Sequence, residues 1–186
     1  MRIIAGAFKG RALAAVGKGD AGAHLRPTTD RVRENLFNIL SGGRFDINID
    51  GARVLDLFAG TGALGLEALS RGAAHLTCVD TGRKSLDLIR QNIAICGAKD
   101  QVKILKCDAT RLPKNGDAPF NLIFLDPPYK KSMGERAIAL ALAGGWIADD
   151  ALIIWEEGQD IVVPAELSLI DTRKYGDSRA YFLTRS

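Results

Sequence analysis

Residues 55–65 read Leu55-Asp56-Leu57-Phe58-Ala59-Gly60-Thr61-Gly62-Ala63-Leu64-Gly65. A short apolar strand pattern leads into three glycines with the spacing G-x-G-x-x-G, and a helical pattern follows. Glycines at these positions permit a tight turn and let the backbone approach a ligand closely. The glycine pattern alone recurs by chance, but its strand–loop–helix setting favours a loop that binds a nucleotide-like cofactor.

Strand and helix patterns alternate along the chain from residue 51 onward. The predicted strands are 53–57, 75–80, 102–107, 122–125 and 151–156, and the predicted helices are 63–71, 83–96 and 135–142. Two last segments, 167–174 and 179–184, flank a turn and predict a terminal hairpin. This order predicts an α/β, Rossmann-like fold: a mostly parallel seven-stranded sheet with helices on both faces and an antiparallel hairpin at its end.

The first 50 residues have a different pattern. Glycines within residues 2–13 predict a small β-hairpin, and a helix is predicted over 30–41, after the N-cap candidates Thr28-Thr29-Asp30. We therefore expect an N-terminal extension over 1–50 and a catalytic domain over 51–186.

Composition narrows the class of protein. The 186 residues are 47% hydrophobic and 25% charged, which is typical of a soluble globular chain with one sizeable core. No apolar run approaches the ~20 residues that span a bilayer, and the N-terminus lacks the apolar core of a secretory signal. The three cysteines are far apart and lack metal-ligand spacing, so we expect reduced thiols, no metal and a cytoplasmic protein.

Positive charge is concentrated at the start of the chain. Residues 1–33 hold seven basic and two acidic residues, a balance of +5, whereas the rest hold 18 basic and 20 acidic residues, a balance of −2. Such a patch indicates a phosphate backbone as partner, although a solvated basic arm has the same composition. The candidate RNA contacts are Lys9, Arg11, Arg26, Arg31 and Arg33.

Acidic residues lie at the ends of the first three predicted strands of the alternating region, at Asp56, Asp80 and Asp108. Asp80 stands where an acid typically binds ribose hydroxyls, and Asp108 is placed to accept from an adenine amino group. Either aspartate also fits a turn or helix cap. The predicted cofactor-binding residues are Asp56, Phe58, Ala59, Gly60, Thr61, Gly62, Asp80, Asp108 and Ala109.

A second loop motif, Asp126-Pro127-Pro128-Tyr129, follows the predicted strand 122–125. It offers a carboxylate, a rigid loop with free carbonyls and a flat ring, which a planar base with an amino group requires. The glycine loop fits either NAD or S-adenosylmethionine. The second motif favours S-adenosylmethionine, because its groups suit amine methylation and have no evident part in hydride transfer.

The combination of motifs resembles a family. Residues 56–62 with 126–129 look like a class I S-adenosylmethionine-dependent methyltransferase that modifies amino groups, and residues 2–6, 25–34, 62–71 and 174–176 resemble the RsmD family. The resemblance covers nearly the whole chain. It implies methylation of the N2 amino group of a guanine in bacterial small-subunit 16S rRNA, with the rRNA, free or within a 30S subunit, as partner, and we expect a monomer.

The resemblance and the chemistry together assign the catalytic motif. Asp126 and the Pro127 carbonyl are expected to accept the two amino hydrogens, Pro127 and Pro128 to hold the loop, and Tyr129 to stack on the flipped base. Three alternatives remain: an enzyme that methylates adenine N6 or a protein glutamine, an NAD-dependent oxidoreductase, and a non-catalytic RNA-binding module. The intact acids argue against the last.

Overall fold

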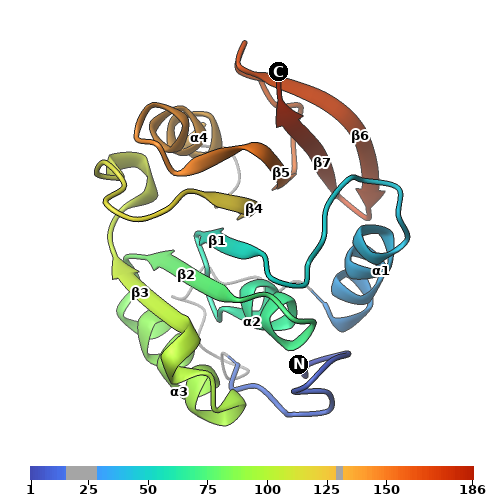
Figure 1. Cartoon of the computed structure of the whole chain (residues 1–186), viewed down its shortest axis with the longest axis vertical. Coiled ribbons are helices and arrows are strands. Elements are labelled where there is room, and N and C mark those ends of the chain that lie inside the picture. Colours follow the sequence, from blue (N-terminus) through green and yellow to red (C-terminus); the bar gives the residue numbers. More distant parts are fainter. Residues whose placement is uncertain (16–28, 129–131) are drawn as a thin grey trace.

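The computed structural model describes residues 1–15, 29–128 and 132–186 (Figure 1). No helix within these ranges is long and apolar enough to cross a lipid bilayer. The helices and strands are α1 (Asp30–Ser41), β1 (Arg53–Leu57), α2 (Ala63–Ser70), β2 (His75–Asp80), α3 (Arg83–Cys96), η1 (Lys99–Gln101), β3 (Val102–Lys106), η2 (Ala109–Arg111), β4 (Phe120–Leu125), α4 (Met133–Ala143), β5 (Ile147–Glu157), β6 (Leu167–Tyr175) and β7 (Ser178–Arg185).

The sheet has seven strands in the order β3-β2-β1-β4-β5-β7-β6 (Figure 1). The pairs from β3 to β5 are parallel, and β7 is antiparallel to both of its neighbours. The predicted Rossmann-like sheet with a terminal hairpin is therefore confirmed. Strand order reverses between β1 and β4, and ligands bind at such a switch point, beside the carboxyl ends of the strands.

Alternating side chains of the strands build two apolar cores, one on each face of the sheet. Val54 of β1 belongs to the core that α1, α2 and α3 cover, whereas its neighbours Leu55 and Leu57 belong to the core that α4 covers. The helices that follow β1 and β4 thus lie on opposite faces, as the doubly wound topology requires.

Most predicted element bounds agree with the structure within one or two residues. Helix α1 begins where its cap predicts, because Thr29 Oγ1 accepts a hydrogen bond from Val32 N at 3.4 Å. Strand β5 begins at Ile147, four residues before its predicted start. The exposed pair Asp149-Asp150 hid this extension, since acidic residues are uncommon in strands.

The N-terminal segment forms the predicted hairpin and shares the core of the domain. Arg2 and Ala12 form an antiparallel bridge, and Ile3 N donates to Arg11 O at 3.1 Å. Ile3 and Leu13 are buried in the same core as α1, α2 and α3. The hairpin therefore packs against these helices through Ile3 and Leu13.

Candidate active site

The loop between β1 and α2 is held in a left-handed backbone conformation. Phe58, Gly60 and Gly62 have φ values of 62°, 57° and 72°. Glycine adopts this region without steric cost, whereas Phe58 is a non-glycine residue there and carries local strain. Ala59 N donates to Val79 O at 3.0 Å, and Gly62 N donates to Ala59 O at 2.7 Å. The loop is thus a preformed turn across the ends of β1 and β2.

Asp80 fixes this loop from the end of β2. Its Oδ2 accepts from Gly60 N at 2.9 Å and its Oδ1 accepts from Gly82 N at 2.7 Å. The side chain remains partly exposed. Because each carboxylate oxygen has two lone pairs, Asp80 keeps acceptor capacity towards solvent beside the glycine loop.

Asp56 of β1 is hydrogen-bonded to the first turn of α2, directly after the loop. Its side chain is buried, and its Oδ2 accepts from Gly65 N at 3.2 Å. Burial raises the pKa of Asp56 to about 7; the Gly65 hydrogen bond opposes this rise, and the nearby charge of Asp80 adds to it. Asp56 therefore joins β1 to the start of α2, and its side chain faces the interior rather than an approaching ligand.

We predict that Asp56→Asn removes a pH-dependent loss of stability. The pKa of Asp56 is raised from 3.8 to about 7, so the folded state holds this proton more tightly than the unfolded chain. The cost of ionising Asp56 therefore appears as pH rises from about 4 to about 7, and above that range it is on the order of 4 kcal/mol. Urea unfolding should show that the free energy of unfolding of the variant, relative to that of the natural protein, is higher at pH 8 than at pH 5. Parallel pH dependence of the two proteins would disprove this role.

Asp108 caps the short helix η2. Its Oδ1 accepts from the hydroxyl of Thr110 at 2.7 Å and from Thr110 N at 2.8 Å. These two bonds, the hydroxyl's first, hold the pKa of Asp108 below its ordinary value. The sequence left Asp108 open as an acceptor for an adenine amino group or as a helix cap, and the structure shows the helix cap. Ala109, the next predicted cofactor residue, is buried beneath it.

The second motif lies directly beside the glycine loop. Leu57 of β1 pairs with Leu125 of β4, and Asp126 N is 3.5 Å from Leu57 O. Phe58 and Asp126 therefore leave adjacent strands at the same edge of the sheet. Asp126 is partly exposed, Pro127 is buried and Pro128 is exposed. Tyr129 lies outside the described residues.

Comparison with known proteins identifies the family. Residues 1–184 match the family described as "Conserved hypothetical protein 95". The chain belongs to this family. "Ribosomal RNA small subunit methyltransferase D" of Escherichia coli strain K12 is 40% identical over 172 residues, covering 91% of this chain and 82% of the relative. The Haemophilus influenzae protein of the same name is 33% identical over 182 residues, covering 95% and 89%.

A solved structure agrees with the same family. That of yhhF from Escherichia coli has a TM-score of 0.84 and 38% identity, covering 100% of this chain and 97% of that chain. The resemblance to the RsmD family and the class I methyltransferase fold predicted from the sequence are both confirmed.

In this family member, one predicted RNA contact is wrong. Arg33 is fully buried, with its guanidinium at 3.0 Å from Asp30 Oδ1 and 3.8 Å from Glu67 Oε2. A side chain buried between α1 and α2 cannot reach a phosphate in solvent. Its charge instead compensates the buried carboxylate of Glu67.

The other predicted RNA contacts that the structure describes lie at the surface. Lys9 and Arg31 are exposed. Arg11 is also exposed, and its guanidinium donates to Ile95 O, at the end of α3, at 2.8 Å. This bond gives Arg11 a structural role besides any contact with RNA. Arg26 lies outside the described residues.

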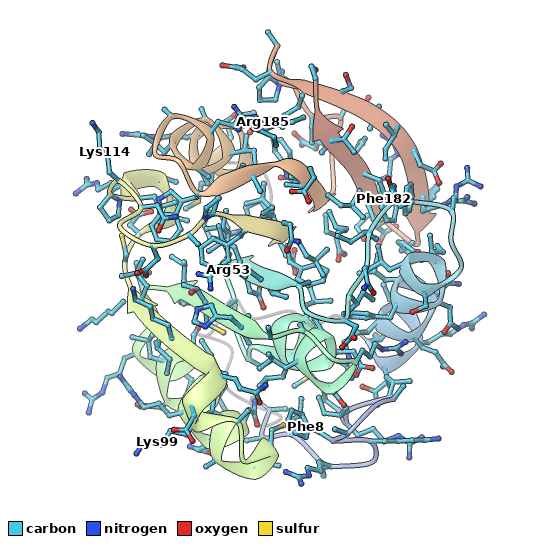
Figure 2. The ribbon with its side chains drawn as sticks, in the orientation of Figure 1. Phe8, Arg53, Lys99, Lys114, Phe182 and Arg185 are labelled. Carbon is cyan, nitrogen blue, oxygen red and sulfur yellow. The ribbon has the colours of Figure 1, made fainter. Side chains whose placement is uncertain are left out.

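Two residues of α2 that sequence reasoning missed hold the N-terminal hairpin. Glu67, fully buried, accepts from Ile4 N at 2.8 Å and from Ala5 N at 3.1 Å. Ser70 Oγ accepts from Phe8 N at 2.9 Å, and Figure 2 shows Phe8 at the edge of the molecule, below α2. The available signal was a lone glutamate inside the apolar run of α2, since a buried charge needs partners.

Side chains of the types that ligate metals are not clustered in the part of the chain that the structure describes. Among 1–15, 29–128 and 132–186, no group of three or more His, Cys, Asp or Glu side chains is arranged to hold a metal ion. The three cysteines are free, and burial raises the pKa of Cys78 well above its ordinary value. Cys78 thus acts as a core residue.

Proposed function

We propose that this protein transfers a methyl group from S-adenosylmethionine to the exocyclic N2 amino group of a guanine in small-subunit 16S rRNA. The observation that carries the proposal is the hydrogen bond from Asp126 N to Leu57 O, because Leu57 is the residue of β1 directly before the glycine loop. It supports the proposal because the loop proposed to bind the cofactor and the motif proposed to bind the amine then start side by side at the switch point. Support for the rRNA substrate comes from the names of the family relatives.

The residues around the glycine loop fit the proposed donor. S-adenosylmethionine carries a methyl group on a positively charged sulfur, together with a ribose and an adenine. Asp80, a partly exposed residue, would accept from the ribose hydroxyls, and the backbone of Phe58–Gly62 would lie along the methionine part. Asp108, whose Oδ1 is held by the N–H and the hydroxyl of Thr110, would accept from the adenine amino group beside Ala109.

The motif at the end of β4 would hold the acceptor. We assign Asp126 and the Pro127 carbonyl to the two hydrogens of the guanine amino group. Two acceptors there localise the nitrogen lone pair and stabilise the positive charge that develops on it. The strand register fixes where this loop starts, and the prolines restrict its backbone. Tyr129 is assigned to stacking on a base that has left its helix.

The exposed basic side chains of the hairpin and α1 would bind the phosphate backbone. Lys9, Arg11 and Arg31 are the described candidates, and Arg26 is retained as a further one. Because the hairpin is hydrogen-bonded to Glu67 and Ser70 of α2, Lys9 and Arg11 lie on a segment that is joined to the helix directly after the glycine loop.

We predict that Lys9→Glu weakens RNA binding by about tenfold and lowers the slope of log affinity against log salt by about one. Lys114→Glu is the matched control, because Lys114 is also exposed but lies at the opposite side of the molecule from Phe8 (Figure 2). Filter binding of small-subunit rRNA at several salt concentrations gives both the affinity and its dependence on salt. Equal salt slopes for the two variants would remove Lys9 from the interface.

Titration calorimetry with S-adenosylhomocysteine and with NAD tests the choice of cofactor. We expect binding of the first and none of the second. Transfer of a labelled methyl group should then be measured to small-subunit rRNA, to adenine-rich DNA and to protein. Label in DNA or protein but not in rRNA would favour the alternative amino-methyltransferases. Binding of NAD alone would favour an oxidoreductase, and donor binding without transfer a non-catalytic module.

A further inference from the structure

One fully buried polar side chain joins the N-terminal hairpin to the glycine loop. Asn92 of α3 is 0% exposed. Its Nδ2 donates to Thr61 O at 2.9 Å and to Ala14 O at 3.1 Å, and its Oδ1 accepts from Ala14 N at 2.7 Å. A single amide thus links α3 to two segments that are 47 residues apart in the sequence, counting from Ala14 to Thr61.

Each linked segment has its own part in the proposed function. Thr61 stands between Gly60 and Gly62, so its carbonyl belongs to the loop proposed to bind the methyl donor. Ala14 ends the hairpin that carries Lys9, which is proposed to bind RNA. In Figure 1 the hairpin lies beside α2 and α3, on the side of these helices away from β4 and β5.

A second contact joins the same two segments. Thr61 Oγ1 lies 3.8 Å from Met1 Sδ, within hydrogen-bonding range for sulfur, and Leu13 N donates to Met1 O at 3.1 Å. Thr61 is therefore joined to both ends of the hairpin, to Met1 directly and to Ala14 through Asn92. The loop cannot move away from the hairpin, or the hairpin from the loop, without leaving the buried amide of Asn92 partly unpaired.

We propose that Asn92 is a positioning residue that couples the two substrates: a methyl donor bound at the glycine loop stabilises the hairpin position that binds RNA, and RNA bound at the hairpin stabilises the loop position that binds the donor. The inference rests on the proposed function, because it assigns the donor to one linked segment and RNA to the other. Coupling of this kind is reciprocal, so each ligand must raise the affinity for the other by the same factor.

The test measures that factor directly. Calorimetry gives the Kd of S-adenosylhomocysteine for the full-length protein, alone and with saturating unmethylated small-subunit particles. We expect binding to be about five- to tenfold tighter with the particles for the natural protein, and about equal for Asn92→Ala. Under steady-state conditions, Asn92→Ala should raise KM for the particles while changing kcat little.

Two further variants make the result decisive. Gln91→Ala, at the exposed neighbouring position of α3, should keep the full factor. Ala14→Pro removes the N–H that donates to Asn92 Oδ1 and restricts φ at position 14, but it leaves α3 intact. A folded Ala14→Pro should therefore also lose coupling, even if Asn92→Ala fails to fold.

Three results would overturn the inference. They are a factor near one in the natural protein, an unchanged factor in Asn92→Ala, and an unchanged factor in a folded Ala14→Pro. These outcomes leave the proposed function standing if methyl transfer to rRNA is observed. Failure of the natural protein to bind S-adenosylhomocysteine would instead overturn the proposed function and this inference together.

Discussion

Asp126→Ala should lower kcat for methyl transfer by about 10²- to 10³-fold while leaving the affinity for S-adenosylhomocysteine within about twofold. Asp126 follows β4 directly, and its N–H lies 3.5 Å from Leu57 O, beside the glycine loop. Its carboxylate is assigned to the guanine amino group, where positive charge develops, and not to the donor. The loss should therefore fall on the chemical step, as measured by single-turnover methyl transfer at saturating donor and RNA.

Two comparisons interpret the result. Asp126→Asn keeps one oxygen acceptor without the charge, so its activity should lie between that of the natural protein and that of Asp126→Ala. Asp177→Ala, an exposed acid in the turn between β6 and β7, should keep full activity. Full activity in Asp126→Ala would contradict the assignment. Loss of donor binding as well would move Asp126 from the acceptor to the cofactor.

Glu67→Ala should destabilise the fold by about 3–5 kcal/mol, because it removes one partner of a buried ion pair. The carboxylate of Glu67 lies 3.8 Å from the guanidinium of Arg33, and both side chains are fully buried. It also accepts from Ile4 N and Ala5 N. Without it, a buried cation and two amide hydrogens lose a partner. For a chain of this size the melting temperature should fall by on the order of 10 °C.

Glu34→Ala is the matched control for this variant, because Glu34 is an exposed glutamate on α1. It should change the free energy of unfolding by less than about 0.5 kcal/mol. Glu67→Gln keeps an acceptor oxygen, so its free energy of unfolding should lie between those of Glu67→Ala and Glu34→Ala. Urea unfolding of all three gives the order. If Glu67→Ala were as stable as Glu34→Ala, the hairpin would not depend on this buried carboxylate.

The parts of the fold that depend on local sequence patterns could be predicted from the sequence. Alternating strand and helix patterns gave the parallel sheet, and the spacing of Gly60 and Gly62 gave the turn, because the left-handed φ values there favour glycine. The position of Asp126 followed from these two features, since parallel strands end at the same edge of a sheet.

Burial of polar side chains could not be read from charge or motif alone. Arg33 was counted as a surface charge, yet its spacing from Leu36, Phe37 and Leu40 puts it on the buried face of α1. Asn92 likewise shares the buried face of α3 with Ile89, Ile93 and Cys96. In both helices the pattern marked a polar residue on an apolar face, but its partner lay in a distant segment that only the tertiary structure brings near.

The most direct test of the account is mass mapping of methylated nucleotides in small-subunit rRNA. The rRNA would come from cells with the gene, cells lacking it, and lacking cells supplied with either the natural protein or Asp126→Ala. We predict that one N2-methylguanosine disappears without the gene, returns with the natural protein and stays absent with Asp126→Ala. An unchanged set of N2-methylguanosines in cells lacking the gene would contradict the proposed function.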